Sequence, residues 1–171
     1  MEQIGFGGGC HWCTEGVFQS LLGVENVQQG WISSLGEYSE YSEAVIVSFN
    51  EEVIALEELI KIHLFTHSST SNHTFREKYR SAVYTFTEHQ VERSLKTVRE
   101  SQLDFDKEIV TQVLPFCDFR LNSEDYQNYL YSRRDNAFCK TYIHPKLSVL
   151  LSKFSNQVNK EKLEELNMIN T

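Results

Sequence analysis

The stretch GGGCHWCTE, from Gly7 to Glu15, lies between an apolar segment at residues 4–6 and apolar residues spaced as on one helix face. Three consecutive glycines allow positive φ angles, so they predict a turn from a strand into a helix. Cys10 then begins the helix, where unpaired N–H groups and the macrodipole favour a thiolate, and we expect a low pKa there. Cys13 follows one turn later, which places a second thiol within reach of the first.

A C-x-x-C pair alone fits a redox pair, half of a metal site, or two buried cysteines. Burial as a small hydrophobic residue is the better interpretation of Cys13 taken by itself. The glycine run argues against that interpretation for Cys10, because a core position needs no open backbone. Zinc binding with Cys117 and Cys139 is disfavoured, because that second pair lacks the spacing of a zinc knuckle.

Hydrophobic periodicity predicts the order strand–helix–strand–strand–helix–strand up to residue 86. The expected strands are residues 4–6, 24–32, 42–49, 79–86 and 108–116. The expected helices begin at Cys10 and at Pro145 and cover residues 54–65, 88–103 and 123–132, with loops at 66–78 and 133–143. This order matches the ferredoxin-like split βαβ pattern. We therefore expect an α/β (α+β) two-layer sandwich, with helices packed on a mixed sheet and a C-terminal elaboration.

The length of 171 residues, without repeats or a linker, predicts one domain at residues 1–156 and a polar tail at residues 157–171. A net charge of −8 without a Lys/Arg cluster disfavours binding to nucleic acid or to an anionic membrane. The start lacks the shape of a signal peptide, and no apolar run reaches membrane-spanning length. We expect a cytoplasmic location, where four irregularly spaced cysteines indicate chemistry rather than a disulfide scaffold.

Five segments in order carry a resemblance to one family, over roughly residues 4–147. They are GGGCHWCTE, SEAV from Ser42, YRSAVY from Tyr79, EDYQNYL from Glu124 and PKL from Pro145. Together they resemble the A-type peptide methionine sulfoxide reductases. The resemblance implies cofactor-free reduction of methionine (S)-sulfoxide, free or in oxidised proteins, followed by regeneration with a thioredoxin-type dithiol. That activity serves protein repair under oxidative stress.

The residues fit this chemistry. Sulfoxide reduction needs a soft nucleophile for sulfur and a proton donor for oxygen, and Cys10 supplies the first. Strand alternation places Glu43 on the face of Val45 and Val47, so we expect a buried carboxyl that holds its proton near neutral pH. The resemblance adds Tyr79 as a second donor to the oxygen.

The second thiol and the substrate pocket complete the expected site. We favour Cys13 as the thiol that condenses first with oxidised Cys10, while Cys139 matches a recycling position of the family and is expected to act as a second relay in a loop. Expected substrate-binding residues are His11, Trp12 and Tyr41.

The chain also departs from the family pattern. His11 replaces an apolar Phe, the segment between Trp31 and Ser42 is shorter than in familiar members, and an Asp is missing before Tyr79. Either Tyr38 or Tyr41 is expected to replace a tyrosine of the shortened segment. Two alternatives therefore stay open: a thioredoxin-like thiol-disulfide oxidoreductase using Cys10 and Cys13, and a non-catalytic homologue that binds sulfoxides.

Overall fold

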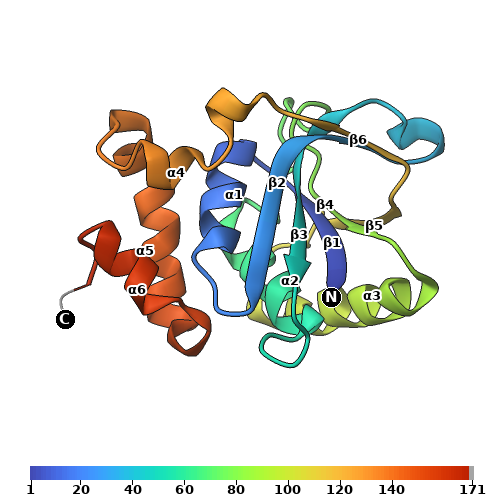
Figure 1. The fold of residues 1–171 in the computed structure, drawn as a ribbon. Coiled ribbons are helices and arrows are strands. Elements are labelled where there is room, and N and C mark those ends of the chain that lie inside the picture. Colours follow the sequence, from blue (N-terminus) through green and yellow to red (C-terminus); the bar gives the residue numbers. More distant parts are fainter. Residues whose placement is uncertain (170–171) are drawn as a thin grey trace.

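Six strands form one mixed sheet in the computed structural model, which describes residues 1–169 (Figure 1). The strands are β1 (Glu2–Gly7), β2 (Val24–Ser33), β3 (Ser42–Phe49), β4 (Ala82–Thr85), β5 (Gln112–Pro115) and β6 (Asp118–Leu121). Their order is β5-β4-β1-β3-β2-β6. The central four strands pair antiparallel, β5 runs parallel to β4, and β6 pairs antiparallel with β2. The central order confirms the predicted ferredoxin-like fold.

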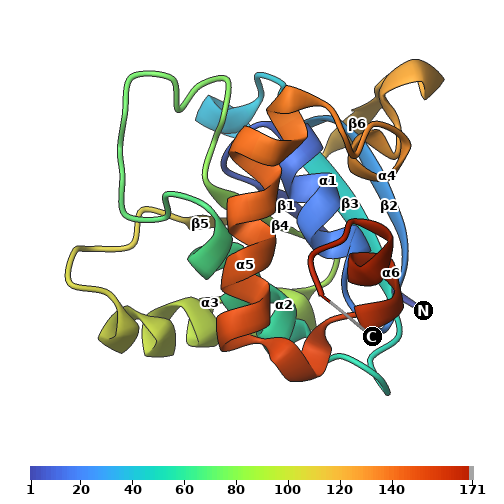
Figure 2. The same ribbon diagram turned by 90° about the vertical axis from the view of Figure 1, so that its left-hand side faces the viewer.

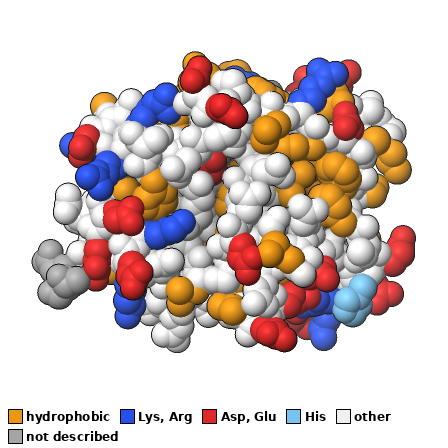
Figure 3. Space-filling view, viewed as in Figure 1, with side chains coloured by type: hydrophobic (Ala, Val, Ile, Leu, Met, Phe, Trp, Pro, Cys, Tyr) orange, Lys and Arg blue, Asp and Glu red, His pale blue; other side chains and the backbone are white. Residues whose placement is uncertain are grey.

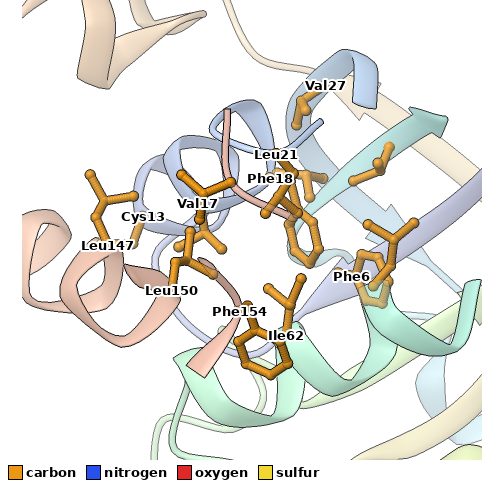
Figure 4. Close-up of a cluster of buried hydrophobic side chains, with 14 of the residues drawn as sticks. Phe6, Cys13, Val17, Phe18, Leu21, Val27, Ile62, Leu147, Leu150 and Phe154 are labelled. Atoms are coloured by element: carbon orange, nitrogen blue, oxygen red, sulfur yellow. The ribbon is translucent and has the colours of Figure 1, made fainter. Parts of the chain in front are cut away.

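Helices cover one face of this sheet. They are α1 (His11–Gln19), α2 (Leu56–Thr66), α3 (Glu88–Ser101), α4 (Tyr129–Ser132), α5 (His144–Lys153) and α6 (Lys160–Glu165). Helix α1 packs directly against the strands, and α2 reaches them where the His63 ring lies 4.8 Å from the Phe6 ring. Helix α5 lies on the outer side of α1 and α2 (Figure 2). The main hydrophobic core fills the space between these layers and includes Phe6 from β1, Phe18 from α1 and Leu150 from α5 (Figure 4).

The second face of the sheet carries a smaller buried cluster. Its residues are Ile32, Ala44, Ile46, Ala82, Tyr84 and Leu114. Partly buried aromatic side chains, including Phe86 stacked on Phe116 at 4.5 Å, pack against this cluster. Figure 3 shows hydrophobic side chains gathered on the side of the molecule where β5 and β6 lie in Figure 1.

Several predicted boundaries change. The strand expected at 79–86 begins only at Ala82, because residues 78–80 are instead bonded to the start of β3, where the Arg80 N–H donates to Ser42 Oγ over 2.8 Å. The strand expected at 108–116 contracts to β5, and the charged strand β6 was not predicted. The helix expected at 123–132 is broken into a 3-10 turn and α4 because Asn128 adopts a left-handed φ of 58°.

The C-terminal segment packs on the domain. Val158 pairs with Leu21 in an isolated bridge, and Leu163 and Leu166 are buried in the main core. Residues 157–166, part of the expected polar tail, thus contribute apolar side chains to the interior. Within residues 1–169, no helix is long and apolar enough to cross a membrane.

The glycine turn has a different requirement at each position. Gly8 has a φ of +154°, and a Cβ there would lie 2.4 Å from the His67 ring. A Cβ at Gly7 would lie 2.9 Å from the Arg80 carbonyl oxygen. A Cβ at Gly9 would meet no atom within 4 Å. The backbone therefore requires glycine at the first two positions, whereas Gly9 leaves open space beside Cys10.

We expect Gly8→Ala to lower the free energy of unfolding by about 1–3 kcal/mol, because a side chain is strained at this φ and collides with His67. Gly9→Ala is the matched control and should leave stability nearly unchanged. Urea unfolding of the two variants measures the difference. Equal losses in both would contradict the assigned roles of these glycines.

Candidate active site

Cys10 occupies the N-cap of α1, directly after the glycine turn. The Cys13 thiol donates a hydrogen bond to Cys10, and the backbone N–H groups of Trp12 and Cys13 point toward it, which together lower the Cys10 pKa. Burial and the nearby Glu43 carboxyl oppose this shift. The lowered pKa confirms the expectation from the sequence, although the leading cause is the second thiol rather than the helix end alone.

Cys13 is buried directly behind Cys10. The first helical turn is tight, because the Cys13 N–H lies 3.1 Å from the Cys10 carbonyl oxygen while the Thr14 N–H lies 3.2 Å from the same atom. The Cys13 pKa is raised, because its thiol donates the hydrogen bond to Cys10 and because the side chain is buried. The tight turn brings the two thiols together in the reduced protein.

The sequence predicted that Cys139 lies in a loop, and this prediction is wrong. The residue begins a π-helix over Cys139–Ile143 that continues into α5, and its side chain is fully buried against α1 in the core that holds Cys13. Burial raises the Cys139 pKa. A π-helical turn widens the backbone by one residue and is frequent at functional sites. Cys139 thus lies close enough to Cys13 to raise the Cys13 pKa further.

Glu43 is the second residue of β3 and is only 6% exposed, which confirms its predicted burial. Its Oε1 atom accepts from the His11 N–H over 3.4 Å and lies 3.2 Å from the His11 Nε2 atom. Its Oε2 atom lies 3.7 Å from the Lys78 ammonium. Lys78, which the sequence analysis passed over because it lies in a polar loop, thus faces the carboxyl from outside.

Tyr79 follows Lys78 in the chain, and Tyr41 comes directly before β3. Tyr79 sits before β4 rather than on it, half-buried, with the Lys78 ammonium 5.1 Å from its ring centre. The Tyr41 hydroxyl donates to Asp118, and the Arg120 guanidinium stacks 4.0 Å from its ring. A cavity of about 840 Å³ opens here, and its wall includes Trp31, Tyr41 and Lys78. The cavity adjoins the residues around Glu43 rather than covering Cys10.

Trp12 forms a half-buried aromatic wall beside Cys10. Its ring stacks on Tyr129 at 4.2 Å and 7°, and on Tyr126 at 5.5 Å. The Phe138 ring meets it edge-on at 5.3 Å. This stack links α1 to the C-terminal elaboration and offers a flat apolar surface next to the thiol.

Comparison with known proteins decides the family. The family model described as peptide methionine sulfoxide reductase matches residues 2–160. This chain belongs to that family. The peptide methionine sulfoxide reductase MsrA of Acinetobacter baumannii is 31% identical, over 91% of this chain and 97% of its own.

Solved structures agree on the fold. The reduced form of Mxr1 from Saccharomyces cerevisiae has a TM-score of 0.70 at 24% identity and covers 82% of this chain and 90% of its own. Mxr1 in complex with Trx2 has a TM-score of 0.60 at 23% identity, over 75% of this chain and 84% of its own. The family model and the relative at 31% identity confirm the predicted membership of the methionine sulfoxide reductase family, and the solved structures support the fold.

Glu15 connects α1 to the C-terminal elaboration, a role that the sequence analysis missed. The side chain is fully buried. Its two oxygens accept from the backbone N–H groups of Asn128 and Tyr129, each over 2.9 Å, and from the Gln29 side chain over 2.9 Å. Burial raises its pKa against these bonds. Its partners come from distant segments, so no local sequence pattern marks this role.

His63 and His67 pack against the glycine turn from α2 and the residue after it. His63 Nε2 donates to the Gly7 carbonyl oxygen over 2.8 Å, and the two imidazoles stack at 4.1 Å. His67 Nε2 lies 2.7 Å from the Ser81 hydroxyl oxygen. Arg76 adds a donor to the Gly8 carbonyl oxygen over 3.1 Å. The turn before Cys10 is therefore bonded on both of its first two carbonyl groups.

This histidine pair predicts a pH-dependent stability. Burial lowers the pKa of His63 well below its usual range and that of His67 to about 3. The unfolded chain takes up these protons below about pH 6.5, whereas the folded chain does not, so stability is complete above that pH and falls below it. We expect a loss of up to about 1.4 kcal/mol per pH unit for each histidine.

Urea unfolding between pH 7.5 and 5 measures this slope. His63→Gln keeps a donor for Gly7 and cannot titrate, so it should remove one proton from the slope. A slope identical to that of the wild type would contradict the assignment.

Proposed function

We propose that this chain is a thiol-dependent oxidoreductase that reduces methionine (S)-sulfoxide, in peptides or free, to methionine. The observation that carries this proposal is the meeting of Cys10, with its lowered pKa, and the buried Glu43 carboxyl at the start of α1. A thiolate and a proton donor at one place are the two groups that sulfoxide reduction requires. Membership of the peptide methionine sulfoxide reductase family supports the same reaction.

In the first stage, the Cys10 thiolate attacks the sulfoxide sulfur while Glu43 and Tyr79 donate hydrogen bonds to its oxygen. The oxygen passes to Cys10 as a sulfenic acid, and the sulfoxide sulfur leaves as a thioether. Of the expected substrate-binding residues, His11 is buried and Tyr41 lies at the cavity, whereas the half-buried ring of Trp12 stands beside Cys10. We therefore assign contact with the methyl group to Trp12.

In the second stage, a neighbouring thiol condenses with the sulfenic acid and releases water. We propose Cys13 as this thiol, because its thiol is already hydrogen-bonded to Cys10 in the tight first turn. Cys139, buried against the same helix, is proposed to pass the disulfide outward. An external dithiol of the thioredoxin type then restores the thiols, a step to which the Mxr1–Trx2 complex lends support. A cycle that starts from a free thiolate suits the reducing cytoplasm.

Neither alternative is favoured. A thioredoxin-like oxidoreductase would use Cys10 and Cys13 but would leave the buried Glu43 without a role. A non-catalytic homologue would not need the lowered pKa of Cys10. The family match also favours turnover over both.

We expect Cys10→Ser to abolish methionine formation even in a single turnover, because a hydroxyl is a poor nucleophile for sulfur at neutral pH. The exposed Cys117 provides the matched control, and Cys117→Ser should retain activity. Methionine is quantified after mixing each variant with one equivalent of a dabsylated (S)-sulfoxide. Product from Cys10→Ser would mean that another thiol does the chemistry, whereas no product from the wild type would refute the proposed function.

The identity of the resolving thiol is testable by peptide mapping. After one equivalent of substrate without reductant, Cys139→Ser should contain mainly a Cys10–Cys13 disulfide, because the tight first turn already joins these thiols. Cys13→Ser should instead accumulate sulfenic acid at Cys10. The assignment is reversed if Cys139→Ser accumulates the sulfenic acid while Cys13→Ser is tolerated.

A further inference from the structure

His11 opens α1, yet its imidazole does not line an open pocket. The residue is 3% exposed. Its Nδ1 atom lies 2.6 Å from the Gly30 carbonyl oxygen on β2, and its Nε2 atom lies 3.2 Å from Glu43 Oε1 on β3. The Trp31 ring meets it nearly edge-on, with 5.1 Å between ring centres. The imidazole is therefore held between two strands rather than presented to a substrate.

These contacts determine how many protons the pair carries. A carbonyl oxygen only accepts, so the Nδ1 atom of His11 bears a hydrogen. One further proton must then lie between Nε2 and Glu43 Oε1, either on the carboxyl or on the imidazole. Without it, two lone pairs would face each other at a buried site, which is costly. The geometry therefore favours one proton shared by His11 and Glu43.

We propose that His11 is a positioning residue that fixes Glu43 and shares with it the proton consumed in sulfoxide reduction. This inference rests on the proposed function. A thiolate, a sulfoxide and one proton give a sulfenic acid and a thioether: the sulfoxide S–O bond breaks, an S–O bond forms at Cys10, and the proton ends on the sulfenic oxygen. When the dithiol regenerates Cys10 as a thiol, ionisation of that thiol returns one proton to the pair.

The charged groups around the pair act in opposite directions. The Lys78 ammonium, 3.7 Å from Glu43 Oε2, opposes the shared proton. The Cys10 thiolate, which interacts with Glu43 across the helix start, favours it. The Tyr79 ring lies under the Lys78 ammonium, with 5.1 Å between the nitrogen and the ring centre. The His11 Nε2 atom gives the proton a second site beside the Glu43 oxygen, which offsets the effect of Lys78. Without the imidazole, the pair should therefore lose this proton at a lower pH, and the rate should fall first on the alkaline side.

The kinetic test uses His11→Phe, which keeps an aromatic ring but neither nitrogen, with the exposed His89→Phe as the matched control. Single-turnover rates are measured from pH 5.5 to 9. We expect the alkaline limb of His11→Phe to move at least one pH unit lower, which is about a tenfold loss of rate on that limb, with little change in KM. In a Glu43→Gln background, His11→Phe should have no further effect. An unmoved limb with a raised KM would mean that His11 only lines the substrate pocket, and would overturn the inference.

An activity-independent test uses ¹⁵N-histidine NMR, with the His11 signals assigned by their loss in His11→Phe. We expect a protonated Nδ1 at neutral pH and a titration midpoint that Glu43→Gln shifts by at least one pH unit. A hydrogen on Nε2 alone, or a midpoint indifferent to Glu43→Gln, would overturn the shared proton. Wild type that shows the shared proton but reduces no sulfoxide would refute the proposed function and leave the pairing intact.

Discussion

The hydrogen bond from His63 to the Gly7 carbonyl oxygen is the constraint on which the geometry of the site depends. It ties the end of β1 to α2, while His67 fills the space that a side chain at Gly8 would need. The chain must therefore leave the sheet along one path, and that path places Cys10 at the first N–H groups of α1. A reactive thiol is held here by backbone geometry and packing.

Each side of α1 then has a separate task. Cys13 and Val17 face the core shared with α5, Glu15 binds the backbone of the C-terminal elaboration, and His11 reaches back to β2 and β3. Trp12 stacks on Tyr129, whose position depends on Glu15. Because one short helix joins all these partners, a shift of any of them is transmitted to the thiol.

Much of this could be predicted from local patterns. Alternation located β3 with its buried Glu43, and the glycines located the helix start with Cys10. Lys78, Glu15 and the π-helix at Cys139 were missed for a physical reason: each is defined by tertiary partners. Periodicity does not show that a lysine in a polar loop lies beside a carboxyl. It also does not show that a helical glutamate binds distant N–H groups, or that a cysteine before an apolar helix lies near another thiol.

Both tryptophans of the chain flank this site. Trp12 stands beside Cys10, and Trp31 meets the His11 ring. Thiols, disulfides and charged imidazoles quench indole emission to different degrees, so the two indoles act as native optical probes of neighbouring events. Trp12 is placed to report the oxidation state of the thiols, and Trp31 the charge of the imidazole. The catalytic cycle can thus be followed in the unlabelled protein by its own fluorescence.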